Sequence, residues 1–370
     1  DQTSQANVLS GYGGNDTIFG LGGDDTIDGG DGTIGPDGDD LIVAGDGADL
    51  ILGSAGNDFI SGGGYAEEEG TYFAVGDESI DTLSYIGRNE GLDLSLTGID
   101  QGTVQADADS SLAISTFTNT YSSDISQQLI TVPTNQVVTD WTDSFGDIQN
   151  LVLTTQNDIV RFDVGDVNTG SIDAADGSLD TLDYSSFGAD NPVLVNLSDE
   201  AEYNFDFDDN GIIDTTIGEI TIVNANSATN VMVSEASSQG GAGGVSGFEV
   251  VIGGAGDDAI VGNNADNLLV GNAGNDRIAG GAGNDTIYGG DGDDYITPGA
   301  GADLVIAGAG INTIAITSSD LAEDVFNVDR NGINTFKLEG DGTQTTSIAA
   351  QSGDWNPGAD GIALLDGGDP

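Results

Sequence analysis

The sequence lacks cysteine and histidine, and it contains only five lysine or arginine residues among 370. Without cysteine no disulfide can stabilise the fold, and thiolate chemistry is excluded. Without histidine the commonest general base is missing. A serine nucleophile would need a lysine as its base, and Lys337 is the sole lysine. These absences remove most classes of enzyme.

A glycosidase built on two carboxylates is the class of enzyme that the composition still allows. With 64 acidic residues, however, a close pair of carboxylates is expected by chance. The repeats described below account for most of these acids by cation binding. We therefore expect that the chain is not an enzyme.

The scarcity of basic residues also excludes partners that carry phosphate. Nucleic-acid binding needs clustered lysine and arginine, and so does attraction to anionic lipid. The basic residues are instead scattered singly along the chain, as Arg88, Arg161, Arg277, Arg330 and Lys337. Since no apolar run is long enough to cross a bilayer as a helix, we expect no membrane insertion.

The formal net charge of −59 is too large to ignore. Like charges at this density repel each other and oppose a compact state. Aliphatic residues are plentiful, so the chain is not simply a disordered acidic tail. Either the folded chain is swollen with counterions or it binds multivalent cations.

Two arrays of nine-residue repeats dominate the sequence. The first runs from GYGGNDTIF at Gly11 to GSAGNDFIS, which ends at Ser61, with a six-residue insertion around Gly29 to Ile34. The second starts with GGAGDDAIV at Gly253 and continues unbroken to Ala315. Each repeat has an aspartate or asparagine at its sixth position and an aliphatic residue at its eighth.

The repeat predicts an all-β solenoid. Glycine at the first, third or fourth position permits backbone conformations that are closed to other residues. The first six residues of each repeat, mostly glycine, asparagine and aspartate, make a turn. The last three residues make a very short strand. Such a strand cannot bury its aliphatic side chain alone, whereas stacked copies form an internal aliphatic ladder.

Stacking also collects the sixth-position side chains into columns. Hard cations neutralise such columns, and calcium accepts flexible all-oxygen coordination more readily than magnesium does. The alternative is that the turns are merely solvated. The candidate ligands are Asp16, Asp25, Asp40, Asp49 and Asp58 in the first array and Asp258, Asn267, Asp276, Asp285, Asp294, Asp303 and Asn312 in the second.

These repeats resemble those of the RTX (repeats-in-toxin) family, the hemolysin-type calcium-binding repeats. The resemblance implies a parallel β-roll with two repeats in each turn and many bound calcium ions. It implies that aspartates two repeats apart share an ion, in the columns Asp16–Asp40–Asp58, Asp25–Asp49, Asp258–Asp276–Asp294 and Asp285–Asp303. Asn267 and Asn312 keep an oxygen but lose the charge, so weaker binding is expected there.

The residues between the arrays contain an internal duplication. SIDTLSYIG at Ser79 is echoed at Ser178, and the segment from Ile148 aligns with the segment from Phe248, which places Asp158 where Asp258 falls. We expect an irregular continuation of the solenoid with long excursions at Gln101–Asp143 and Asp199–Gly244. The alternative is an independent β-sandwich between two rolls.

One acidic segment within the second excursion resembles the first nine positions of an EF-hand-like loop. It is DFDDNGIID, with candidate ligands Asp206, Asp208, Asn210 and Asp214. The twelfth position is Ile217 and not the bidentate glutamate of that motif. A calcium loop in a β context is therefore predicted, and a solvated acidic turn is the alternative.

After Ala315 the repeats decay, and a hairpin around Arg330–Gly332 is predicted within a C-terminal cap. We expect four segments: a first β-roll at 1–64, a duplicated β-rich spacer at 65–245, a second β-roll at 246–316 and a C-terminal β cap at 317–370. No signal peptide is recognisable, and the first recognisable repeat begins at Gly11. These two features are consistent with a processed or excised piece of a longer protein, and they leave open whether the chain is a fragment.

Two functions are consistent with these features. The first is a secreted bacterial structural protein that folds on calcium outside the cell, as part of a surface layer, filament or adhesin. Its partners would then be calcium and either further copies of itself, in a filament or lattice, or a cell-surface polysaccharide. The alternative is the calcium-folding, secretion-assisting portion of a larger secreted enzyme or toxin, exported by a type I system as the resemblance implies.

Overall fold

The protein is described by a computed structural model. It describes residues 5–30, 38–54, 56–68, 71–75, 79–88, 90–107, 142–164, 170–175, 177, 179–198, 202–203, 222–223, 227–230, 245–317, 325–327, 334–339 and 345–348. All regular elements in these ranges are β-strands. A search of the same ranges finds no helix with the length and apolar character needed to cross a membrane.

The chain divides into two compact units. The first consists of residues 1–182 together with 241–248, and the second of residues 183–240 together with 249–370. The first unit thus contains the first array, and the second unit contains the second array. The strand β16 (Thr181–Asp183) crosses the boundary between them.

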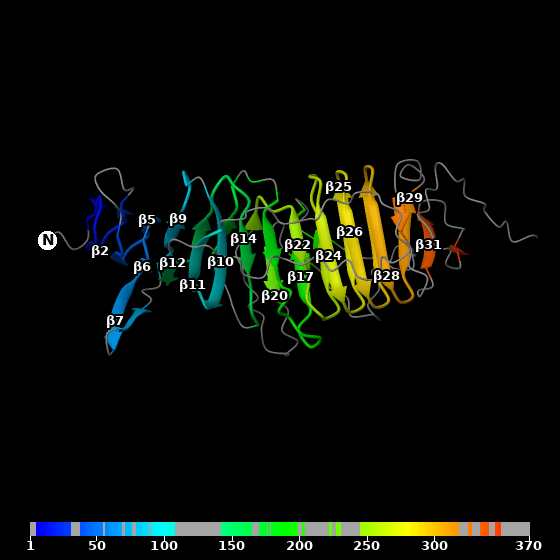
Figure 1. The fold of residues 1–370 in the computed structure, drawn as a ribbon, viewed down its shortest axis with the longest axis horizontal. Helices are drawn as coiled ribbons and strands as arrows, with labels where there is room; N and C mark the ends of the chain where they lie inside the picture. Colours follow the sequence, from blue (N-terminus) through cyan, green and yellow to red (C-terminus); the bar gives the residue numbers. More distant parts are fainter. Residues whose placement is uncertain are drawn as a thin grey trace, which may run out of the picture. The chain divides into compact units, whose positions relative to one another are not determined.

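The second unit is the more regular of the two and consists of two sheets of mostly parallel strands (Figure 1). One sheet contains, in spatial order, β22 (Val250–Ile252), β24 (Leu268–Ala273), β26 (Thr286–Asp291), β28 (Leu304–Ala309) and β30 (Val325–Asn327). The other contains β20 (Ser227–Asn230), β17 (Val193–Asn196), β23 (Ala259–Val261), β25 (Arg277–Ala282), β27 (Tyr295–Ala300), β29 (Thr313–Thr317), β31 (Asn334–Glu339) and β32 (Thr345–Ile348).

Successive repeats alternate between these sheets, so two repeats make one turn of the roll, here called a coil. The eighth-position aliphatics of one sheet pair in register, Leu269 with Ile287 and Ile287 with Val305. In the other sheet Ile260, Ile278, Ile296 and Ile314 do the same. All of these side chains are fully buried. The predicted parallel β-roll with an internal aliphatic ladder is confirmed.

The glycines of the repeat serve two different purposes. Gly281, at the second position, has φ of +106°, and Gly283, at the fourth, has φ of +122°. Both lie in the left-handed region that favours glycine. Gly280, at the first position, is needed for space, because a Cβ there would collide with the carbonyl oxygen of Pro298 one coil further on. The left-handed positions are thus the second and fourth, and not the first or third.

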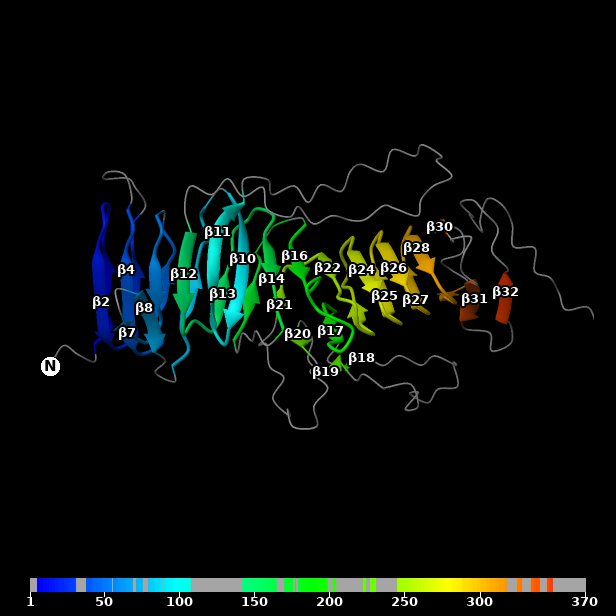
Figure 2. The same ribbon diagram turned by 60° about the horizontal axis from the view of Figure 1, so that its bottom comes forward.

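The first unit also has two sheets (Figure 2). One is parallel throughout its pairings, with the order β1 (Val8–Ser10), β3 (Thr26–Asp28), β5 (Leu50–Leu52), β9 (Thr82–Ser84), β13 (Asn150–Val152), β15 (Ile172–Asp173) and β21 (Val245–Ser246). The other has the order β2 (Thr17–Gly22), β4 (Leu41–Asp46), β6 (Phe59–Ser61), β12 (Thr142–Gly146), β11 (Gln101–Asp107), β10 (Gly91–Gly98) and β14 (Ile159–Arg161).

Small antiparallel pairs are attached to both units. In the first unit β7 (Gly64–Glu68) pairs with β8 (Thr71–Val75). In the second unit β18 (Glu202–Tyr203) pairs with β19 (Ile222–Val223). Neither pair interrupts the order of strands in the large sheets.

The insertion in the first array does not break the ladder. Ile18 pairs with Ile42, and Ile42 pairs with Ile60. The hydrogen-bonded sixth-position residues Asp16 and Asp40 are 24 residues apart, whereas Asp40 and Asp58 are 18 apart. The six additional residues therefore leave the stacking of the coils unchanged.

The region between the arrays continues the same sheets. Leu83 pairs with Ile51 of the first array on one side and with Leu151 on the other. This is the irregular solenoid that was predicted and not an independent sandwich. The first excursion is shorter than predicted, however, because β11 starts at Gln101 and pairs antiparallel with both β10 and β12.

Two further expectations are wrong at the ends of the units. The repeats do not begin at Gly11, since β1 already pairs in parallel with β3 and places Leu9 beside Ile27. The predicted hairpin around Arg330–Gly332 does not form between β30 and β31. These strands continue different sheets, β30 beside β28 and β31 beside β29. The observed hairpin joins β31 to β32.

Candidate metal sites

The sixth-position side chains of the second array form two columns. In each coil Oδ1 of the side chain accepts a hydrogen bond from the backbone amide of the sixth-position residue one coil earlier. The distances are 2.8 Å from Asp258 to Asp276, 3.0 Å from Asp276 to Asp294, 2.9 Å from Asp294 to Asn312, 2.9 Å from Asn267 to Asp285 and 2.8 Å from Asp285 to Asp303. The predicted columns are therefore present, while the role of these residues as ligands stays a prediction.

The second carboxylate oxygen is the functional feature of these columns. Oδ2 of Asp276, Asp285 and Asp294 is buried and has no hydrogen-bond partner. Each side chain as a whole is at most 2% exposed. Because buried polar atoms nearly always have a partner, an unpaired carboxylate oxygen repeated in successive coils indicates that a ligand belongs there.

A backbone carbonyl faces the same small space as each of these oxygens. A Cβ added to Gly280 would collide with both Asp285 Oδ2 and the carbonyl oxygen of Pro298. At Gly289 it would meet Asp294 Oδ2 and the carbonyl oxygen of Ala307. The glycine thus leaves open a cradle lined by one carboxylate oxygen and one carbonyl oxygen from the next coil.

Calcium fits this set of donors. It prefers oxygen ligands, including backbone carbonyls, and tolerates irregular geometry. No group of three or more acidic side chains converges on one point in the described ranges. Backbone carbonyls must therefore supply part of the coordination, and the residues that would hold the ions are Asp276, Asp285 and Asp294 with the carbonyls that face them.

Burial makes these carboxylates expensive to ionise without a cation. Burial, with repulsion from Asp258 and Asp294 added, raises the pKa of Asp276 to about 8. Burial likewise raises the pKa of Asp285 and of Asp294 to about 7. A bound divalent cation would favour the charged form instead. Metal binding and proton binding therefore compete at these positions.

The first array has the same arrangement. The amide of Asp16 donates to Asp40 Oδ1 at 2.8 Å, and the amide of Asp25 donates to Asp49 Oδ1 at 2.7 Å. The amide of Asp40 donates to Asp58 Oδ1 at 2.9 Å. Oδ2 of Asp16 and of Asp25 is buried without a hydrogen-bond partner. The predicted columns are again present, and these two aspartates match the pattern of the second array.

The columns extend into residues that the repeat pattern did not reveal. Asp58 donates its amide to Asp143 Oδ1, Asp49 donates to Asp81 Oδ1, and Asp81 donates to Gln149 Oε1. A signal existed for Asp81, because Asp81–Leu83 retains the Asp-x-aliphatic end of a repeat. The duplicated triplet at Asp180 has the same role, since Asp180 Oδ1 accepts from the amide of Asp158. Asp143 and Gln149 have no such signal.

The predicted equivalence of Asp158 and Asp258 agrees with the structure. Oδ1 of Asp158 accepts from the amide of Leu92 at 2.7 Å, and Oδ1 of Asp258 accepts from the amide of Val193 at the same distance. The Oδ2 atoms accept from the amides of Thr154 and Gly254, each four residues earlier. These two aspartates therefore differ from Asp276, because both of their oxygens already have protein donors.

Asparagine replaces the charge at two positions. The side-chain amide of Asn312 donates to the carbonyl oxygens of Ala307 and Gly308. The side-chain amide of Asn267 donates to the carbonyl oxygen of Glu249. An NH₂ group thus points at carbonyls, which is consistent with the weaker calcium binding expected at both positions.

The EF-hand-like segment with Asp206, Asp208, Asn210 and Asp214 lies outside the described residues. Its role as a calcium loop stays a prediction.

The structure also contains a second ladder, at the fifth position of the repeat. The amide of Asn275 donates to Asp257 Oδ1 at 2.7 Å, and Asn275 Oδ1 accepts from the amide of Asp293 at 2.8 Å. The amide of Asn284 donates in the same way to Asp266 Oδ1. In the fifth-position ladder each side chain accepts a hydrogen bond from the amide of the following coil. In the sixth-position ladder each side chain accepts from the amide of the preceding coil. The frequent Asn or Asp before the sixth position was its signal in the sequence.

Together, two parallel sheets, an aliphatic ladder and stacked oxygen cradles define a calcium-binding repeat protein of the β-roll class. The family model of the RTX calcium-binding nonapeptide repeat, which spans four copies, matches residues 2–33, 34–64, 243–278, 270–305 and 279–314. No curated protein matches the chain significantly. The two arrays are RTX repeats, and the cofactor that they bind is calcium, as multiple ions.

Proposed function

We propose that this protein is secreted by a bacterium, folds on calcium outside the cell and serves there as a structural component of a surface layer, filament or adhesin. The observation that carries this proposal is the repeated buried Oδ2 without a hydrogen-bond partner at Asp276, Asp285 and Asp294. A chain with a net charge of −59 has few other ways to remain compact.

The mechanism follows from the coupling of metal binding to folding. Without calcium each cradle buries a carboxylate that must either take up a proton or remain an unpaired charge. With calcium the binding free energy adds to the folding free energy. A low calcium concentration inside the cell thus favours an unfolded chain suited to export, and a high concentration outside favours the roll.

Calcium titration tests this coupling on the full chain. We expect the β circular dichroism signal to fall when EGTA is added and to return with excess calcium, whereas magnesium restores it poorly. An unchanged spectrum in EGTA would contradict calcium-dependent folding.

Self-assembly is the structural role that the edge of the first unit supports best. Among the described strands β1 and β2 are the terminal strands of their sheets. They and the turn between them expose Val8, Tyr12, Phe19 and Leu21 by 84%, 58%, 41% and 60%. An apolar sheet edge favours pairing with another chain. Contact with a different surface of the next copy gives filaments or rings and not closed dimers.

Light scattering distinguishes assembly from a monomeric module. We expect the full chain in millimolar calcium to form species larger than a monomer, and the substitution Leu21→Lys to reduce them. Ile311→Lys is the matched control, because Ile311 is likewise an exposed aliphatic residue, at 54%, but belongs to the second array and not to β1 or β2. A strictly monomeric species at high protein concentration would count against self-assembly.

The alternative function is the secretion-assisting portion of a larger secreted enzyme or toxin. It is favoured by the same calcium coupling, since a segment that folds only outside the cell suits export of an attached domain. We propose that the chain itself has no catalytic role, because it has neither histidine nor cysteine. A catalytic domain encoded in the same gene would support the alternative.

A further inference from the structure

The sixth-position carboxylates fall into two groups according to what their second oxygen contacts. In the second array Oδ2 of Asp276, Asp285 and Asp294 has no hydrogen-bond partner. At two positions in the middle of the first unit, as at Asp258 in the second array, the same atom has a donor from the protein. Tyr85 Oη donates to Asp143 Oδ2 at 2.7 Å, and the amide of Thr154 donates to Asp158 Oδ2 at 2.9 Å.

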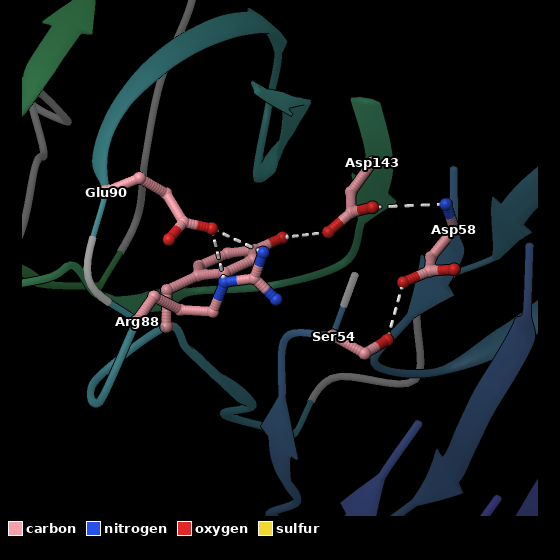
Figure 3. Close-up of polar contacts among 6 residues, drawn as sticks. Ser54, Asp58, Arg88, Glu90 and Asp143 are labelled. Carbon is pink, nitrogen blue, oxygen red and sulfur yellow. Dashed lines mark hydrogen bonds and ion pairs between the residues drawn. The ribbon is translucent and has the colours of Figure 1, made fainter. Parts of the chain in front are cut away.

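Figure 3 shows the first of these carboxylates and its neighbours. Ser54 Oγ donates to Asp58 Oδ2 at 2.7 Å, and the amide of Asp58 donates to Asp143 Oδ1 at 3.1 Å. With the Tyr85 hydroxyl this makes a continuous chain of donors and acceptors in which both oxygens of Asp143 are satisfied. Ser54, Tyr85 and Asp143 are at most 1% exposed. The polar groups are thus buried and paired without a cation.

Two acidic side chains of this region are paired with arginines. Arg161 Nε lies 2.9 Å from Asp93 Oδ1, and Asp93 is only 6% exposed. Arg88 pairs with Glu90 (Figure 3). The next member of one column is the neutral Gln149, whose Oε1 accepts from the amide of Asp81. At this position of the column a neutral amide thus replaces a carboxylate.

Part of this region has a large apolar core. The strand β10 alone buries Leu92, Leu94 and Leu96, and it packs beside β11, which buries Val104. In the second array β24 also buries three aliphatic side chains, whereas β26 buries one, Ile287. Because apolar burial is the main favourable contribution to folding, β10 and β11 give this region a source of stability that does not depend on a cation.

We propose that residues 79–107 and 142–164, here called the middle section, form a calcium-independent section of the roll that stays folded when the repeats of the second array unfold in chelator. The strand β12 of the middle section pairs in parallel with β6, which is the last strand of the first array. When the first array folds, its last coil can therefore pair with a strand that is already folded. The inference rests on calcium-dependent folding of the arrays.

Hydrogen exchange on the full chain, read by mass spectrometry peptide by peptide, tests the inference. In EGTA we expect amides of 91–107 and 142–164 to keep their protection, while amides of 268–309 lose it. Loss of protection in both regions overturns the inference alone. Retention in both regions overturns calcium-dependent folding and the inference with it.

The substitution Tyr85→Phe tests the cause. It removes the donor to Asp143 Oδ2 and leaves a buried carboxylate oxygen like those of the second array, which is costly without a cation. In EGTA we expect exchange in 142–164 to become at least about tenfold faster, equivalent to about 1.4 kcal/mol. Tyr12→Phe is the control, because it removes a hydroxyl from an exposed tyrosine.

A second variant guards against a local packing effect at Tyr85. Ser54→Ala removes the donor to Asp58 Oδ2 with little change in volume. We expect it to accelerate exchange of the β12 amides in EGTA, with a smaller effect in calcium. If both Tyr85→Phe and Ser54→Ala leave exchange in EGTA unchanged, the protein donors do not replace calcium and the proposal is wrong.

Discussion

Asp294 accepts a hydrogen bond from the amide of Asp276 at 3.0 Å through Oδ1, while its Oδ2 is buried with no hydrogen-bond partner. One carboxylate therefore has two functions. Its first oxygen fixes the register of neighbouring coils, and its second remains available to a cation. A substitution that removes only the charge should weaken cation binding and leave the register unchanged.

The substitution Asp285→Asn is expected to raise the calcium concentration at the folding midpoint. It keeps an oxygen for the amide of Asn267 but removes the negative charge from the cradle. Asp257→Asn is the matched control, because it removes one charge from an exposed residue of the same array and keeps an oxygen for the amide of Asn275. Circular dichroism during a calcium titration measures both midpoints, and equal midpoints would indicate that the second oxygen does not bind the ion.

A methyl group placed in a cradle should have a similar effect by another route. In Gly280→Ala the new Cβ collides with Asp285 Oδ2 and with the backbone carbonyl of Pro298, which cannot move without displacing the next coil. We expect lower stability in calcium and a higher calcium midpoint.

Gly188→Ala is the control for this change. A Cβ at Gly188 meets no atom within 4 Å, so no loss is expected. Calcium titration followed by thermal unfolding compares the two variants. Equal behaviour of the two would show that the cradle at Gly280 has no functional importance.

The sequence predicted the regular part of this fold well, because each repeat encodes its own turn, its aliphatic residue and its aspartate. It failed where partners come from distant segments. The hydrogen bond between Asp58 and Asp143 joins residues that are 85 positions apart, and no local sequence pattern predicts it. The wrong hairpin at Arg330–Gly332 has a related cause, since an Asn-Gly pair predicts a turn but not whether the next strand returns to the same sheet.

Acidic pH is expected to stabilise the second array when calcium is absent. In the calcium-free roll the pKa of Asp276 is about 8 and that of Asp285 about 7, raised first by burial, whereas an unfolded chain titrates near the ordinary value of about 4. The folded state therefore holds more protons between about pH 4 and pH 8, and its stability falls as the pH rises through this window.

Protein freed of metal on a chelating resin should accordingly show more β signal at about pH 5 than at pH 8. Asp285→Asn is the control for general charge repulsion, because it removes one titrating group and should lessen the difference. The calcium concentration at the folding midpoint should rise as the pH falls, because protons compete with calcium for the same carboxylate oxygen. A β signal that does not increase on acidification would be evidence against buried carboxylates in the calcium-free roll.

The fifth-position ladder should stabilise the roll without taking part in calcium binding. Asn275 accepts from the amide of Asp293 and donates to Asp257, so Asn275→Ala removes a link on each side of one coil. Because these groups are exposed and water replaces the lost partners, we expect a loss of about 0.5–1.5 kcal/mol in calcium. Ile311→Ala is the matched control, since Ile311 has the same repeat position but its side chain has no hydrogen-bonding group. Chemical denaturation in saturating calcium measures the loss, and calorimetric titration should show an unchanged number of bound ions. A reduced number of ions in Asn275→Ala would mean that the fifth position belongs to the metal sites after all.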